Sequence, residues 1–263
     1  MLTDCFGNPI QTQNAIAITF DTDWAPDWCI ALCFELCLQF DITATFFVTN
    51  TSPILKKIAS NDRFELGIHP NFLVNHNIKK DNTLFYQNIL KSYLQIVPEA
   101  KSIRSHSLYR DSRLFVYIEE QVPSICNEVS TFLPGHIGLQ PVPIRFSPHG
   151  RSLLHFSCIW EDDIAILEPQ RWLTPLFNSA LPGVYIFNFH PIHIALNSCS
   201  PEQYSNLRKF YNIPDVTPED CNKFANKTLF GVKDYFERLI ESVINSFPPF
   251  PSFRTINSIS QNY

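Results

Sequence analysis

Short apolar runs alternate with helical stretches along the first 200 residues, and this alternation restricts the fold more than any other feature of the sequence. The runs at 15–20, 44–50 and 64–69 are rich in aromatic and β-branched residues, as buried strands are. The stretches at 28–40 and 52–60 between them are typical of helices. Such an order predicts parallel βα units, and either an α/β barrel or an open, doubly wound sheet would satisfy it.

The rest of the chain continues this pattern less regularly. Further strands are expected at 102–107, 125–133, 155–162 and 184–190, and helices at 80–96, 113–121, 201–211 and 229–246, with a proline-rich loop at 139–148 and a broken helical segment at 167–181. With 263 residues, 45% of them apolar, and no obvious linker, we expect one domain over 1–263. Its core spans about 15–197, and a helical tail spans about 200–247.

The net charge, the first ten residues and the lengths of the apolar runs limit the kinds of partner and compartment that we expect. The formal net charge is −5 and the basic residues are scattered, which disfavours a nucleic-acid groove or an anionic membrane surface. Residues 1–10 have neither a basic start nor an apolar stretch, and no run approaches the roughly 20 apolar residues of a membrane span. We therefore expect a cytoplasmic protein without a membrane span. The absence of a glycine-rich phosphate loop excludes the common nucleotide-binding folds.

The eight cysteines do not form a recognisable metal or disulfide pattern. Cys29, Cys33 and Cys37 recur at helical spacing, and no CxxC pair occurs. We interpret them as reduced, mostly buried thiols that pack like small apolar side chains.

The stretch ITFDTDWAPD, residues 18–27, places two carboxylates one residue apart at the end of an apolar run. In an extended strand Asp21 and Asp23 would point the same way. Carboxylates held together either share a proton or bind a cation. Alternatively, Asp23 or Asp27 caps the helix that begins near Trp28. The stretch alone is compatible with both interpretations.

Other polar side chains also follow the ends of predicted strands. They are His69, Arg104, His106, Asp162, Asp163 and His190. In parallel α/β folds the carboxyl ends of the strands form the edge where ligands bind. Carboxylates with imidazoles suit Zn²⁺ or a similar divalent ion. The sequence thus favours a metal site at this edge.

The order of these motifs resembles the polysaccharide deacetylases, the NodB-homology enzymes of carbohydrate esterase family 4. TFD-x-D comes first, then a strand-ending histidine, an arginine strand, an aspartate and a late strand histidine. The resemblance covers about 15–197 and is closest to the subgroup associated with lipopolysaccharide O-antigen biosynthesis. It implies an α/β fold, a distorted or incomplete (β/α) barrel with a parallel sheet, followed here by C-terminal helices. It also implies metal-dependent hydrolysis of N-acetyl groups on sugars.

The resemblance assigns metal ligands with two departures. Asp21 matches the aspartate of TFD, the general base, and the inserted Thr22 makes Asp23 the expected ligand. His69 matches the first histidine of the family's HxxxH motif, which is broken here because the next histidine is His76. For the third ligand we favour His106, since adjacent parallel strand ends lie about 4.8 Å apart, with His76 as the alternative.

The remaining roles are also implied by the resemblance. Arg104 matches the arginine that keeps the catalytic aspartate ionised. His190 matches the general acid, which family members pair with an aspartate. Asp162 is our first choice for that partner, with Asp163 and Glu161 as alternatives.

The expected activity is removal of an N-acetyl or similar acyl group from a sugar or glycan precursor, nucleotide- or lipid-linked, with Zn²⁺ as the favoured metal. Aromatic residues are candidates for stacking on the sugar ring: Trp24, Trp28, Phe72 and Trp160. The alternatives are a metal-dependent amidohydrolase for a non-sugar amide and a non-catalytic carbohydrate-binding relative. The broken HxxxH motif is the best argument for the latter.

Overall fold

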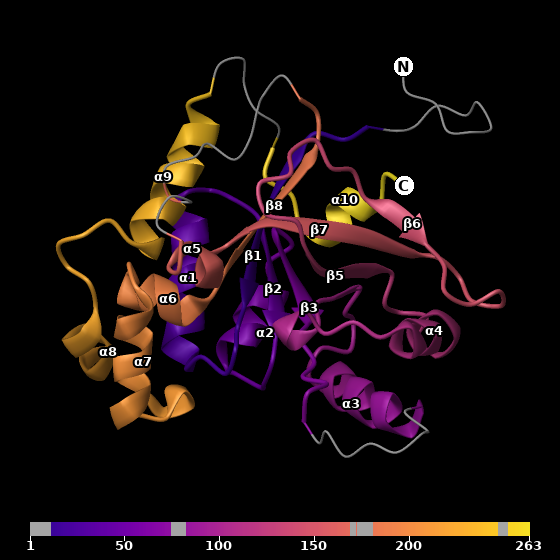
Figure 1. The fold of residues 1–263 in the computed structure, drawn as a ribbon, viewed down its shortest axis with the longest axis horizontal. Helices are drawn as coiled ribbons and strands as arrows, with labels where there is room; N and C mark the ends of the chain where they lie inside the picture. The colour runs from indigo at the N-terminus through magenta and orange to yellow at the C-terminus, as the bar shows by residue number, and fades with distance from the viewer. Residues whose placement is uncertain (1–11, 75–82, 169–171, 173–180, 247–251) are drawn as a thin grey trace.

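A computed structural model describes residues 12–74, 83–168, 172, 181–246 and 252–263. Seven parallel strands close into a barrel (Figure 1). In spatial order they are β1 (Ala15–Asp21), β2 (Ala44–Val48), β3 (Phe64–Ile68), β4 (Ser102–Ile103), β5 (Asn127–Phe132), β7 (Leu153–Glu161) and β8 (Val184–Phe189), which returns to β1. The pairing of β5 with β7 closes the ring. The barrel is thus confirmed, and the open sheet is excluded.

Helices surround this barrel. They are α1 (Asp27–Gln39), α2 (Ile54–Ala59), α3 (Thr83–Ile96), α4 (Ser112–Gln121), α5 (Asp162–Ala165), α6 (Pro191–Leu196), α7 (Pro201–Phe210), α8 (Pro218–Phe224), α9 (Val232–Ile244) and α10 (Ile256–Ser260). Figure 1 shows α6 to α9 on the side of the barrel that carries α1, with α3 and α4 on the other side. The expected C-terminal helices are therefore present. Within the described residues, no helix is long and apolar enough to cross a membrane.

Two predicted elements differ from the structure. The expected strand at 102–107 ends at Ile103, and a 3₁₀ turn follows over His106–Leu108. Ser107 and Leu108 have φ of 54° and 51°, a left-handed conformation that an extended strand cannot contain. The expected loop at 139–148 contains β6 (Val142–Ile144), which pairs antiparallel with β7. Its Pro143 is compatible with an edge strand. Most of the segment 167–181 lies outside the described residues.

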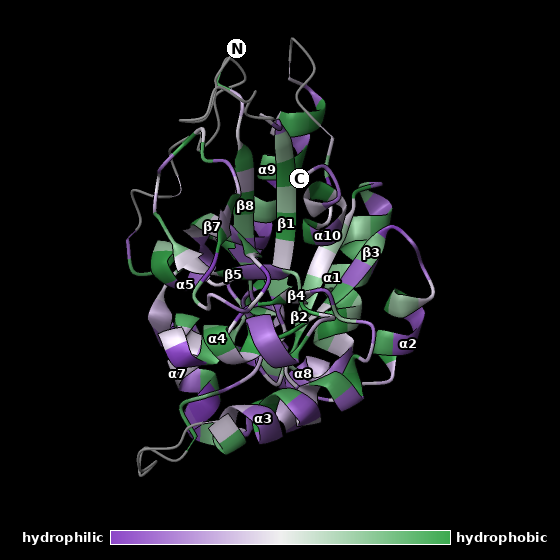
Figure 2. Ribbon diagram, turned by 90° about the vertical axis from the view of Figure 1, so that its right-hand side faces the viewer, coloured by the Kyte–Doolittle hydropathy of each residue, from purple (hydrophilic) through white to green (hydrophobic). Residues whose placement is uncertain are grey.

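The interior of the barrel is mainly apolar at the amino ends of the strands, where Glu65 is held by hydrogen bonds from Thr45 and Ser102. Because strand side chains alternate, Ala15 and Ala17 of β1 point inward while Ile16 and Ile18 pack against the outer helices. Figure 2 shows how apolar β1 and β8 are. The inner cluster comprises Ala15, Ala17, Phe47, Val129, Phe156, Cys158, Val184 and Ile186 together with Ile256 and Ile259 of α10. The short helix α10 thus closes this end of the barrel.

The cysteine prediction is confirmed for the described residues. Cys29, Cys33 and Cys37 are buried on one face of α1, and the seven described cysteines are free thiols. Burial raises the pKa of the Cys33 thiol well above its usual value. These thiols therefore act as core packing.

Candidate metal and catalytic site

The two carboxylates after β1 converge, but not by the expected route. Asp21 is the last residue of β1, whereas Asp23 and Trp24 have φ of 41° and 56°. The prediction that both carboxylates leave one face of an extended strand is therefore wrong. They meet instead at His69, whose Nε2 lies 3.8 Å from Asp21 Oδ2 and 3.1 Å from Asp23 Oδ1.

Side-chain hydrogen bonds hold this left-handed turn in place. The hydroxyl of Thr49 accepts a hydrogen bond from the backbone N–H of Trp24 at 2.9 Å and pairs with the hydroxyl of Thr22 at 2.9 Å. Two consecutive non-glycine residues with positive φ are costly, so the surrounding structure must impose the turn. Its effect is to aim Asp23 at the histidines.

The helix-cap interpretation is wrong for both aspartates. The residue that caps α1 is Pro26, and α1 has no side-chain cap. The carboxylate of Asp27 instead accepts a hydrogen bond from the backbone N–H of Ile54 at 2.8 Å, at the start of α2. Asp27 therefore joins two helices, and Asp23 faces the site.

Three imidazoles surround the carboxylate of Asp23. His69 Nε2 lies 3.1 Å and His106 Nδ1 3.3 Å from Asp23 Oδ1, and His190 Nε2 lies 3.6 Å from Oδ2. Burial by itself would raise the pKa of Asp23, but hydrogen bonds with His106 and His69 and the nearby positive charge lower it well below its usual range. Asp23 is therefore a carboxylate at any physiological pH.

His69 has the tautomer that a metal ligand needs. The ring is almost completely buried, and Nδ1 donates a hydrogen bond to the backbone carbonyl of Arg104 at 2.7 Å. In the neutral ring the lone pair is then on Nε2, which faces Asp23. Burial lowers the pKa of His69, but the charges of Asp21 and Asp23 outweigh it and raise the pKa overall. A bound cation would compete with that proton for Nε2.

His106 reaches the cluster from the 3₁₀ turn after β4 rather than from a strand. The strand expected at 102–107 is therefore wrong for His106. The backbone N–H of His106 donates to the carbonyl of Pro70 at 3.0 Å, and the ring meets that of Trp24 edge-on with centroids 5.1 Å apart. The alternative ligand, His76, lies outside the described residues.

The donor atoms of Asp23, His69 and His106 lie within 4.8 Å of one another, a set that could hold a metal ion. One carboxylate oxygen and two imidazole nitrogens match the three protein ligands of an open, catalytic divalent site. The groups Asp21, Glu161, His190 and Asp162, Asp163, His190 meet the same distance criterion. His190 belongs to both of these groups, and its Nδ1 is bonded to Asp162.

Arg104 lies inside the barrel and is completely buried. Its Nη1 donates to Asp21 Oδ1 at 2.9 Å and to the hydroxyl of Thr19 at 3.0 Å. The guanidinium also lies 4.4 Å from the ring centroid of Phe47. The positive charge is therefore fixed against Asp21 in a place that water does not reach.

Asn188 is a site residue that the sequence analysis missed. Its Nδ2 donates to Asp21 Oδ2 at 2.8 Å, and its Oδ1 accepts from Arg104 Nη1 at 2.5 Å. Both oxygens of Asp21 are thus held by donors. The signal was present, because alternation along β8 puts Asn188 on the same face as His190, two residues later.

Asp162, rather than Asp163 or Glu161, is the carboxylate bonded to His190. Its Oδ1 lies 2.6 Å from Nδ1 of His190, and its Oδ2 accepts from the backbone N–H of His190 at 2.7 Å. Burial lowers the pKa of His190, but the charges of Asp163 and Asp162 raise it well above its usual value. The shift favours the protonated ring, whose Nε2 lies 3.6 Å from Asp23 Oδ2.

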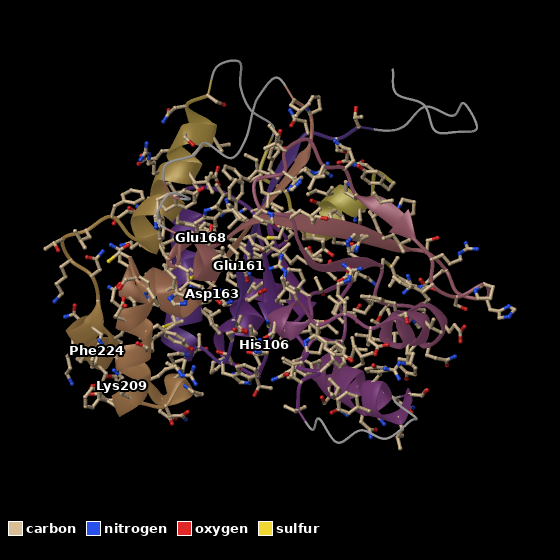
Figure 3. The ribbon with its side chains drawn as sticks, viewed as in Figure 1. His106, Glu161, Asp163, Glu168, Lys209 and Phe224 are labelled. Atoms are coloured by element: carbon tan, nitrogen blue, oxygen red, sulfur yellow. The ribbon has the colours of Figure 1, made fainter. Side chains whose placement is uncertain are left out.

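The other two carboxylates have different neighbours. Asp163 Oδ1 lies 2.9 Å from Nε2 of His193, whose Nδ1 lies 2.9 Å from the hydroxyl of Ser198. Burial raises the pKa of Glu161 to about 7, although the charge of His190 opposes the shift. Figure 3 labels Glu161, Asp163 and His106, which lie around the carboxyl ends of the strands.

A cavity of about 800 Å³ opens beside the histidines and is lined by Asp23, Trp24 and His106 at one side. Of the four aromatic candidates for sugar stacking, Trp24 alone is among its lining residues. Phe72 and Trp160 are buried in the core, and the indole N–H of Trp28 donates to the carbonyl of Val216 at 2.7 Å. The cavity also has Tyr204 and Tyr211 in its wall, which the sequence analysis did not identify.

Solved structures resemble this fold to different degrees. WbmS of Bordetella bronchiseptica, a candidate polysaccharide deacetylase involved in O-antigen biosynthesis, is 27% identical with a TM-score of 0.74, over 88% of this chain and 91% of the other. A carbohydrate esterase family 4 pseudoenzyme from Bacillus anthracis is 12% identical with a TM-score of 0.46, over 94% of this chain and 65% of the other. The second likeness is too distant to bear on function.

A search of curated proteins found no match. The family model described as "WbmS-like: Polysaccharide deacetylase" matches residues 18–208, which is more than half of the chain and includes every expected site residue. The chain therefore belongs to the WbmS-like family of polysaccharide deacetylases.

Proposed function

We propose that this protein is a metal-dependent hydrolase that removes the N-acetyl group of an acetamido sugar during surface polysaccharide biosynthesis. The observation that carries the proposal is that the side chains around Asp23 have distinct sets of partners. One carboxylate lies among imidazoles, while Asp21 and His190 are each fixed by partners of their own. Membership of a polysaccharide deacetylase family supports this choice of reaction.

Asp23, His69 and His106 would hold the ion. A nitrogen-rich set with one carboxylate favours Zn²⁺ among the common divalent metals. When bound, such an ion polarises a carbonyl and lowers the pKa of a water molecule. Because His69 donates through Nδ1 to a backbone carbonyl, its ring is oriented before any ion arrives.

Asp21 is suited to accept the proton of the attacking water. Arg104 and Asn188 donate to its two oxygens, which fixes the carboxylate beside a positive charge. Oxygen Oδ2 is 3.8 Å from His69 Nε2, so the base lies beside the ligand cluster without belonging to it. Asp21 therefore has the position and the charge of a general base.

His190 is suited to protonate the departing nitrogen. Its Nδ1 is bonded to Asp162, so the proton available for transfer is on Nε2, which points toward Asp23. The raised pKa keeps that proton in place until a more basic amine forms. Acid and base therefore approach the cluster from two adjacent strands, β8 and β1.

Acetate release from a panel of acetamido sugars tests the proposal. We expect release by the wild-type protein, loss of release with a chelator, and loss in a His69→Ala variant. His149→Ala, which removes an exposed histidine away from the site, is the matched control and retains activity. Release from non-sugar amides instead would indicate a different amidohydrolase. Chelator-resistant sugar binding without any acetate would indicate a binding protein.

A further inference from the structure

Part of the wall of the cavity beside the candidate metal site is formed by residues that have no role in the proposed deacetylation. One side is formed by Asp23, Trp24 and His106. The opposite side is formed by the last turn of α7 and the segment after it, including Arg208 and Lys209. Figure 3 shows Lys209 on α7, a different element from the turn that carries His106.

Arg208 and Lys209 are cations without an anionic partner. Within the described part of the chain, no carboxylate lies within ion-pair distance of either side chain. The guanidinium of Arg208 lies 5.6 Å from the ring centroid of Tyr204, and Lys209 donates to the side chain of Asn206 at 2.9 Å. Other surface lysines differ in this respect: Lys233 is paired with Glu237 at 3.7 Å, whereas Lys56 and Lys91 are exposed with no described carboxylate at ion-pair distance.

The charge balance of the cavity favours an anion at that wall. Among the described lining residues the sole carboxylate is Asp23, which is surrounded by imidazoles and is the proposed ligand of a divalent ion. Two uncompensated cations in the wall of a cleft raise the local concentration of anions. The last turn of a helix favours basic residues through the helix dipole, but this explains their presence without explaining why they face a cavity.

The size of the cavity indicates a ligand larger than one sugar. Its volume of about 800 Å³ lies toward the upper end of the roughly 300–1,000 Å³ typical of small-molecule sites. Tyr204 and Tyr211, which also line it, offer aromatic surface to such a ligand.

We propose that the substrate is a phosphate-linked acetamido sugar, with its phosphate bound by Arg208 and Lys209 and its acetamido group at the metal site. This inference rests on the proposed deacetylation. Arginine and lysine are the usual protein partners of phosphate, and charge-assisted hydrogen bonds make such contacts stronger than neutral ones. The phosphate can belong to a nucleoside diphosphate sugar or to a polyprenyl diphosphate sugar, since both present the same charged group.

The test compares three forms of one acetamido sugar: free, linked to a nucleoside diphosphate, and linked to a polyprenyl diphosphate. Acetate release is measured for the wild-type holoenzyme, for an Arg208→Gln/Lys209→Gln double variant, and for a Lys233→Ala control on α9. We expect at least one phosphate-linked form to exceed the free sugar about tenfold to a hundredfold in kcat/KM, chiefly through KM. The double variant loses most of that preference and the control keeps it. The better phosphate-linked form identifies the carrier.

Isothermal titration with the same nucleoside diphosphate sugar and polyprenyl diphosphate sugar keeps the inference testable if no sugar releases acetate. Binding that is lost in the double variant would support the phosphate site and refute the deacetylase proposal alone. Binding of neither compound, or equal binding by wild type and double variant, would overturn the phosphate site. Binding that is unchanged in the double variant would indicate that the phosphate binds the metal, which would also overturn the phosphate site. A wild type that shows no preference for the phosphate-linked sugars would also overturn it.

Discussion

The interior of the barrel differs between its two ends: apolar side chains dominate at the amino end, and charged side chains dominate at the carboxyl end. At the amino end, Ile256 and Ile259 of α10 pack with Ala15 and Ala17 of β1. At the carboxyl end of the same strand, Asp21 is bonded to a completely buried arginine. The seven residues of β1 therefore lead from a mainly apolar layer to a charged site.

The contrast separates the part that stabilises the barrel from the part that we propose as the catalytic site. Burial of apolar surface at the amino end is favourable without geometric demands. The carboxyl end buries charges and holds Asp23, Trp24, Ser107 and Leu108 at positive φ, which costs stability. The apolar layer must offset that cost, so changes at the two ends should have different consequences.

The largest effect is expected for Asp21→Asn. The amide has almost the same shape but cannot accept the water proton, so kcat should fall about a thousandfold. The metal content should stay as in the wild type, because Asp21 is not an assigned ligand. Acetate release and elemental analysis measure the two quantities. Asp62→Asn, an exposed aspartate, is the matched control. Loss of the metal together with activity would show that Asp21 is a ligand.

Arg104→Ala should lower both stability and activity. The change leaves Asp21 buried without its cation and opens space inside the barrel, so the free energy of unfolding should fall by about 3–5 kcal/mol. Urea unfolding monitored by circular dichroism measures this loss, and acetate release measures kcat. A variant with wild-type stability would mean that Arg104 is not the partner that Asp21 requires.

Ile259→Ala should affect stability alone. Removing a fully buried side chain from the layer at the amino end should cost about 2–4 kcal/mol, while kcat and metal content remain those of the wild type in the folded protein. The control is Ile244→Ala, the same substitution at an exposed position, which should change stability by less than about 0.5 kcal/mol. A large fall in kcat in folded Ile259→Ala would mean that the two ends are coupled.

The smallest effect concerns the pH dependence of the amino end. Burial raises the pKa of Glu65, although donors on Ser102, Asn257 and Thr45 oppose the shift. The folded protein then keeps this proton to a higher pH than the unfolded chain. Glu65 therefore makes stability fall as pH rises from about 4.5 up to its folded pKa, with a slope below about 1.4 kcal/mol per pH unit.

Glu65→Gln should remove that slope, because glutamine does not titrate. Its amide can still accept the hydrogen bond from the backbone N–H of Asn257, which lies 2.8 Å from the carboxylate. Urea unfolding of both proteins at several pH values between 4.5 and 8 measures the difference. Equal slopes in the two proteins would contradict the assignment.

The sequence analysis predicted the fold well where strands are long and apolar. The strands ending at Asp21 and before His190 were predicted because their apolar runs have no competing helical interpretation. The strand expected at 102–107 exists but ends at Ile103, since two residues of strand and a left-handed turn leave no periodic pattern. The small strand β6 was missed because prolines usually indicate loops.

For the site, the order of motifs along the chain was a better guide than the periodicity of side chains within single elements. The alternation of strand side chains gave the wrong position for Asp23, and the strand expected at 102–107 gave the wrong one for His106. Both residues lie in turns that contain residues with positive φ, which a sequence pattern does not reveal. Asn188 was overlooked because a lone amide in an apolar strand has no distinctive spacing. Its position two residues before His190 was the available clue.

The most direct test of the central claim is a crystal structure of the purified protein with anomalous scattering recorded at the zinc edge. We expect one strong peak per chain, at about 2.0–2.2 Å from Asp23, His69 and His106. Asp21 and His190 should lie outside this coordination shell. A peak bound by Asp21, Glu161 and His190 instead, or an active protein without a peak at any metal edge, would contradict the account.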